Sequence, residues 1–167
     1  MTTILKVANR SLSYCLSSIT PISSILLTTI LMVVTSQIAW AASYTVCQLP
    51  ASCDFASPEA AVNDPVIADG DTIDIVSDTY VLGDTLRVNN SITILANGSV
   101  FDGNGLRAIH VFNAATNLSL SNVTIRNGGP DTGFGGGALR VTGGATVTVI
   151  GGVFEDNQAE YGGAVHN

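Results

Sequence analysis

The stretch GGALRVTGGATVTVIGGVF at residues 136–154 decides the fold, because it joins short bursts of alternating apolar and polar residues through glycine pairs. Alternation with a period of two is typical of a strand with one buried face, and glycine suits a tight corner. The burst at 139–141 has equivalents at 86–88 and 109–111, separated by 23 and 30 residues. The same short strand therefore returns along the chain.

Other bursts recur in the same order. The burst at 147–149 matches those at 92–94 and 118–120, at offsets of 29 and 26 residues. A further set of equivalent apolar positions is Phe101, Ile125 and Phe154. A repeat of this length made only of short strands predicts a solenoid, in which parallel rungs stack about 4.8 Å apart. An antiparallel sandwich would also contain many short strands, but its strands would not return in register.

Asparagine and glycine mark the expected corners between strands. Both residue types tolerate the left-handed backbone conformation that tight corners require. Asn104, Asn127 and Asn157 fall near comparable corners of successive repeats. We therefore expect a ladder in which their side-chain amides bond to one another along the axis.

Two segments of the chain resemble a known group of proteins. Residues 154–167, with Phe154, Asn157 and the run Gly-Gly-Ala-Val, are similar to the repeats of polymorphic outer-membrane proteins. Residues 70–105 are similar to the N-terminal opening of bacterial surface proteins with a pectin-lyase-like fold. The resemblance implies an all-β, right-handed parallel β-helix of three to four coils over residues 67–167. Ile125 and Gly128 depart from the repeat pattern.

The composition excludes several classes of protein. Of 167 residues, 11% are charged and 46% hydrophobic, which argues against disorder and against a coiled coil. The net charge of −7 makes nucleic acid a poor partner, because phosphate binding depends on clustered cations. All 17 glycines lie beyond residue 41.

Residues 1–41 have the layout of a secretory signal peptide. Lys6 and Arg10 precede an apolar run at 22–34, and the small residues Ala39 and Ala41 suit signal peptidase. The alternative is an uncleaved membrane anchor, but the run is shorter than the roughly 20 residues that a spanning helix needs. Cleavage after Ala41 would deepen the net charge from −7 to −9, since both cations leave with the peptide. We therefore expect an exported protein without a membrane span in the mature chain.

Residues 42–66 are predicted to be a lead-in to the repeats. Cys47 and Cys53 lie close together, and in an exported protein such a pair more often forms a disulfide than a metal site. Ser57 is suited to cap a short helix that begins at Pro58 and ends near Val62.

One set of outward positions stands out in the matched strands. The central residue is cationic or a histidine in every copy, including the last partial repeat: Arg87, His110, Arg140 and His166. Stacked rungs would place these side chains in one column. The column is a candidate contact for an anionic glycan or for carboxylates on a partner. The alternative is that outward strand positions accept any polar residue and that nearby acids neutralise the column.

The sequence offers no catalytic, cofactor or metal residues that we can assign. The acids are scattered, and serine-elbow, zinc and phosphate-loop motifs are absent from the sequence. We therefore expect a scaffold, adhesin-like and associated with the bacterial surface or secreted, that binds extended partners such as glycans or cell-surface proteins. The alternative is the N-terminal fragment of a polysaccharide lyase or hydrolase.

The last repeat breaks off soon after it begins, at His166 and Asn167. Solenoids need a terminal cap, because an open rung exposes its apolar ladder and its strand edges. Two expectations follow: either the sequence is a fragment of a longer protein, or copies associate end to end.

Overall fold

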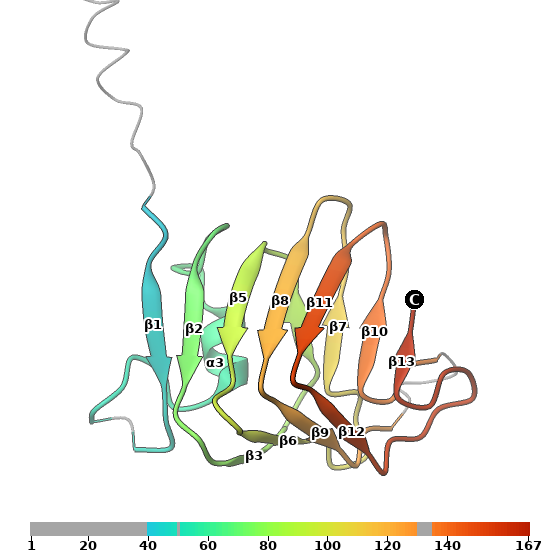
Figure 1. The fold of residues 1–167 in the computed structure, drawn as a ribbon. Helices are drawn as coiled ribbons and strands as arrows, with labels where there is room; N and C mark the ends of the chain where they lie inside the picture. Colours follow the sequence, from blue (N-terminus) through green and yellow to red (C-terminus); the bar gives the residue numbers. More distant parts are fainter. Residues whose placement is uncertain (1–39, 50, 130–134) are drawn as a thin grey trace, which may run out of the picture. The chain divides into compact units, whose positions relative to one another are not determined.

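The computed structural model describes residues 40–49, 51–129 and 135–167, which form a parallel β-solenoid (Figure 1). The predicted fold class is confirmed. The predicted signal peptide lies outside the described residues, except for its last two positions. The described part of the chain contains one helix, which is short. No described helix is long and apolar enough to cross a membrane.

Three parallel sheets make up the solenoid, and every rung after the first contributes one strand to each sheet. Sheet A has five strands in the order β1 (Ser43–Val46), β2 (Thr72–Ile75), β5 (Ile92–Leu95), β8 (Asn117–Ser121) and β11 (Thr146–Ile150). Sheet B contains β3 (Thr79–Val81), β6 (Val100–Asp102), β9 (Thr124–Arg126) and β12 (Val153–Glu155). Sheet C contains β4 (Leu86–Val88), β7 (Ile109–Val111), β10 (Leu139–Val141) and β13 (Val165–His166).

The register follows the repeats read from the sequence. In sheet C, Leu86 is paired with Ile109, which in turn is paired with Leu139. In sheet B the paired positions are Phe101, Ile125 and Phe154, and in sheet A they are Ile94, Leu120 and Val149. These side chains point inward and form continuous apolar ladders. In sheet C all three are buried, and in sheets A and B all are buried except the last ones, Val149 and Phe154. The core is therefore the stack of these ladders.

The solenoid begins earlier than the sequence indicated. Strand β1 lies inside the predicted lead-in and pairs in parallel with β2, from Ser43 opposite Thr72 to Val46 opposite Ile75. Sheet A consequently has five strands, where three to four coils were expected. More than 20 residues separate the strand from β2. That spacing matches the repeat, but the strand was missed because the intervening residues form a helix and a loop rather than two strands.

Helix α3 (Pro58–Asn63) confirms the predicted short helix and packs against the edge of sheet C. Ser57 caps it, because its Oγ accepts a hydrogen bond of 3.2 Å from the amide of Ala60. Ala61 and Val62 face the core and are buried. The helix therefore covers β4 at the end of the stack where a further strand of sheet C would otherwise lie.

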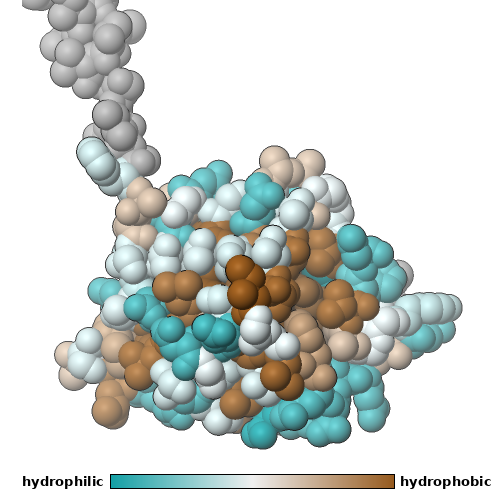
Figure 2. Space-filling view, in the orientation of Figure 1, coloured by the Kyte–Doolittle hydropathy of each residue, from teal (hydrophilic) through white to brown (hydrophobic). Residues whose placement is uncertain are grey.

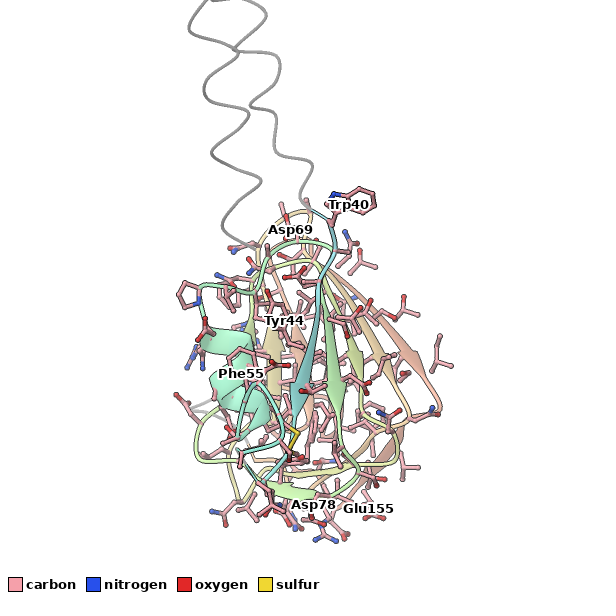
Figure 3. All side chains as sticks on the ribbon, turned by 90° about the vertical axis from the view of Figure 1, so that its left-hand side faces the viewer. Trp40, Tyr44, Phe55, Asp69, Asp78 and Glu155 are labelled. Carbon is pink, nitrogen blue, oxygen red and sulfur yellow. A yellow bond between two sulfur atoms is a disulfide. The ribbon has the colours of Figure 1, made fainter. Side chains whose placement is uncertain are left out.

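The loop between β1 and α3 closes the same end of the solenoid. Cys47 and Cys53 form a disulfide, and Phe55 makes an isolated parallel bridge with Val46. The rings of Phe55 and Tyr44 lie together, with centroids 5.9 Å apart, beside α3 (Figure 3). This loop lies along the outer edge of β1 and hydrogen-bonds to it. The Phe55 amide donates to the Thr45 carbonyl, and the Cys47 amide donates to the Phe55 carbonyl.

The corners use left-handed residues as predicted, but the asparagine ladder is wrong. Asn104 and Asn127 have φ values of 51° and 53°. The Asn127 amide donates to the Asp102 carboxylate at 3.0 Å, whereas the Asn157 amide donates to the Ile125 carbonyl and accepts from the Gly128 amide. Asn127 follows β9 directly, whereas Asn157 lies two residues beyond β12, so their two amides meet different groups of the neighbouring rung.

Candidate functional site

The predicted cation column exists on the outer face of sheet C. The register pairs Arg87 with His110, His110 with Arg140, and Arg140 with His166. Arg87 is exposed, and the other three side chains are half-buried. Neighbouring strands of a parallel sheet lie about 4.8 Å apart, so the column presents a cationic or imidazole group at every rung along the axis.

Residues that follow the strands pack beside this column. The His110 ring lies 5.3 Å from the ring of Phe112, and its Nε2 is 2.9 Å from the Thr142 hydroxyl. These contacts fix the imidazole from two sides. Sequence reasoning missed Phe112, although an aromatic residue directly after a strand, in the turn, was a usable signal.

A hollow of about 290 Å³ lies at the end of the column nearest to α3. It is lined by Arg87, Asn89 and Phe112 from sheet C and its turns, and by Asp64 and Pro65 after the helix. Asp64 Oδ1 already accepts a hydrogen bond of 2.9 Å from the Val66 amide. The hollow thus brings a guanidinium, an amide and an aromatic ring together from segments that are distant in sequence.

Sheet B carries a different column, in which the charges alternate. Asp102, Arg126 and Glu155 are paired across β6, β9 and β12, and the Arg126 Nε lies 3.1 Å from the Asp102 carboxylate. Burial acts to raise the pKa of Asp102, but hydrogen bonds from the Asn104 amide, Asn127 and Arg126 outweigh it and hold the pKa below its ordinary value. The Asp102 carboxylate therefore holds its corner together through these hydrogen bonds.

Sheet A presents a third column, which sequence reasoning missed. The register aligns one outward hydroxyl from each of its five strands: Ser43, Thr72, Thr93, Ser119 and Thr148. The signal was present in the bursts Ser91–Thr93, Asn117–Ser119 and Thr146–Thr148, where polar residues flank an apolar one. Its meaning depends on the register, which decides that these hydroxyls fall in one line.

Sequence reasoning also missed the role of Arg107. It is only 2% exposed, and its guanidinium donates hydrogen bonds of 3.0 and 3.3 Å to the carbonyls of Gly136 and Gly135. A charged group buried in this way is stabilised by the backbone oxygens that surround it. Arg107 therefore ties one rung to the loop of the next and is not available as an outward cation.

Among the residues that the structure describes, no group of three or more histidine, cysteine, aspartate or glutamate side chains is placed to hold a metal ion. Asp71 is buried and uses its carboxylate to accept hydrogen bonds from the backbone amides of Ala42 and Ala68. Asp69 accepts one from the amide of Ser91. The carboxylates of Asp69 and Asp71 therefore hold backbone segments of the first rungs together.

Comparison of the chain with protein-family models, with curated proteins and with solved structures finds no match. The three outward columns are therefore the features from which function is inferred.

Proposed function

We propose that the chain is an exported, adhesin-like scaffold of the bacterial surface or the extracellular space, which binds extended partners such as acidic glycans or cell-surface proteins. The observation that carries the proposal is the cation column of Arg87, His110, Arg140 and His166, aligned in one register. A polymer that lies along the solenoid axis can meet one such group at each rung, about 4.8 Å apart.

The charge of the molecule supports an ionic partner at this column. The sequence carries only 6 lysine and arginine residues against 13 acids, and two of the arginines lie in the column. Acidic surfaces elsewhere repel a polyanion, so binding is directed to the face where positive groups gather. Arg87 is exposed and the other three side chains are half-buried, so salt should weaken the contacts, most strongly at Arg87.

The export part of the proposal rests on two features. Residues 1–41 carry the charge and hydropathy pattern of a signal peptide. The disulfide of Cys47 and Cys53 is of a kind that persists in oxidising compartments outside the cytoplasm. The fold and the repeats also fit kinship with right-handed β-helix surface proteins of the polymorphic outer-membrane and pectin-lyase-like groups.

Binding of the purified chain to immobilised polygalacturonate, a linear acidic glycan, tests the proposal. We expect Arg87→Ala with Arg140→Ala to weaken binding about tenfold at low salt, since each ionic contact at the surface contributes about 0.2–1 kcal/mol. Arg126→Ala is the matched control, because Arg126 is paired with Asp102 on sheet B. Equal binding by the double variant and the parent chain, with polygalacturonate and with whole cells, would overturn the cation column as the contact.

A further inference from the structure

The first described residues carry a feature that the outward columns do not explain. Trp40 is 84% exposed and Ala41 is exposed as well, whereas Ala42 is half-buried and directly precedes β1. Figure 2 shows the first described residues projecting beyond the start of β1, and in Figure 3 Trp40 points away from the strands. The chain therefore enters the solenoid at Ala42.

Ala42 is held on both sides by residues at the start of β2. Its amide nitrogen donates a hydrogen bond of 2.7 Å to Asp71 Oδ1, and its carbonyl accepts one of 2.8 Å from the Thr72 amide. The other Asp71 oxygen accepts from the Ala68 amide at 2.8 Å. Asp71 is only 4% exposed, so the fold places a buried carboxylate directly at the nitrogen of Ala42.

The Asp71 carboxylate has no positive partner within the described chain. Both of its hydrogen bonds come from neutral backbone amides, and no described cationic side chain pairs with it. A buried charge is costly unless an opposite charge compensates it. Asp69 differs in this respect, because it is exposed to water and accepts from the Ser91 amide.

The sequence places the expected cleavage at the same residue. Signal peptidase accepts small residues such as Ala39 and Ala41, and cleavage after Ala41 would make Ala42 the first residue of the mature chain. The two observations are independent. The cleavage pattern lies within residues 1–41, whereas the Asp71 carboxylate reaches Ala42 only through the pairing of β1 with β2.

We propose that removal of residues 1–41 converts this hydrogen bond into an ion pair, in which the new α-ammonium group of Ala42 binds the buried Asp71 carboxylate. Hydrolysis of the bond between Ala41 and Ala42 consumes one water molecule and leaves a carboxylate on Ala41 and a protonated amine on Ala42. That amine supplies the opposite charge that Asp71 lacks, and a charge-assisted hydrogen bond is stronger than a neutral one. The processed chain thus closes its first rung more firmly than the precursor does.

Because the ion pair requires cleavage during export, it rests on the export part of the proposed function. The test uses the full chain, expressed with residues 1–41 and recovered after export from a bacterial host. Mass spectrometry of the intact protein should show that the recovered chain begins at Ala42. Lys6 is the only lysine in the sequence and leaves with the peptide, so a reagent that acetylates amines reports on Ala42 alone.

The rate of acetylation measures how firmly the amine is held. It should be about tenfold slower in the folded parent than in Asp71→Asn, because a neighbouring carboxylate keeps the ammonium group protonated. The matched control is Asp69→Asn, the same change two residues away at a carboxylate that binds the Ser91 amide. This control should react like the parent.

Two modifications of the parent chain provide a readout that does not depend on the folding of Asp71→Asn. Acetylation carried to completion removes the positive charge of Ala42 and keeps one N–H donor, as in the precursor. Reductive dimethylation keeps both the charge and a donor. We expect acetylation to lower the urea midpoint of unfolding and dimethylation to leave it nearly unchanged.

Three results would overturn the inference: a mature chain that begins elsewhere, equal reactivity in the parent and Asp71→Asn, or equal urea midpoints before and after acetylation. The last two, in a chain that is still exported and cleaved, would leave the proposed function standing, and polygalacturonate binding tests that function separately. A chain that keeps residues 1–41 would overturn the ion pair together with the export part of the proposed function.

Discussion

The same ladder positions are buried to different extents at the two ends of the stack. At the N-terminal end, α3, β1 and the disulfide loop cover the first rungs, and Val46, Ala61 and Ile73 are at most 1% exposed. At the other end, β11, β12 and β13 are the outermost strands of their sheets. The inward-facing residues Val147, Val149 and Phe154 there are only half-buried.

This difference shows that burial in a solenoid comes from the adjacent rung. Phe101 and Phe154 occupy the same position of the repeat, and each lies one strand from Ile125. Phe101, which has strands on both sides, is completely buried, whereas Phe154 is half-buried because it has a strand on one side only. The stability contributed by a residue should therefore depend on its rung as well as on its type.

The largest expected effect tests this pair directly. Phe101→Ala should lower the free energy of unfolding by about 3–5 kcal/mol, the usual cost of emptying a closed aromatic site. Phe154→Ala should cost less than half of that, because solvent already reaches the ring. Urea denaturation measures both, and Phe101→Leu serves if the alanine variant does not fold. Equal losses at the two positions would contradict the dependence on rung.

The next effect concerns the loop that closes the N-terminal end. Cys47 and Cys53 are six residues apart. Replacement of both by alanine should lower the free energy of unfolding by about 2 kcal/mol, because the bond restricts a short loop in the unfolded chain. Reduction of the parent protein should reproduce this loss, and the variant should not respond to reductant. A change within the error of the urea midpoint would show that the other contacts of this end suffice.

The smallest effect is a dependence on pH at the same end. The backbone amide of Thr45 donates to Asp54, as does the Thr45 hydroxyl, and these bonds hold the pKa of Asp54 below its ordinary value of 3.8. The stability that they contribute is complete above that value and is lost as the pH falls through the lowered pKa. Thermal unfolding across the acidic range should show a decline that Asp54→Asn reduces.

The control for the pH effect lies at the opposite end of the stack. Asp156→Asn is the same chemical change at an exposed corner of the last rung. We expect it to leave the acidic decline unchanged. An equal reduction by both variants would mean that general charge repulsion causes the decline, and not the bonds between Asp54 and Thr45.

Much of the rung could be predicted from local patterns. The alternation around Ile94, Leu120 and Val149 fixed which side chains point inward, and the intervals between equivalent bursts fixed the register that the structure contains. Ser57 and Pro58 similarly predicted the start of the only helix in the described chain. These features are local, or they repeat, so that each copy supports the interpretation of the others.

The features that occur once were harder to predict. Strand β1 lies alone before the helix and has no preceding copy to match, so its parallel pairing with β2 was missed. Arg107 is an ordinary arginine in the sequence, and only the folded loop of Gly135 and Gly136 supplies the carbonyls that bury it. The amides of Asn127 and Asn157 found different partners for the same reason, because a shift of one residue at a corner changes what they face.

The same distinction between repeated and single features applies to the candidate site. The cation column could be predicted because every copy of one burst carries its cation or histidine at the central position. The column of outward hydroxyls on sheet A could not, since Ser43 lies outside the predicted repeats and Thr72 was not matched to the recurring bursts. Both join the line only through the pairing of β1, β2 and β5. Alternation in the chain determines which side chains face outward. Contact between rungs determines which of them stand in one row and which polar groups remain free, because those depend on hydrogen bonds between segments that the chain order keeps apart.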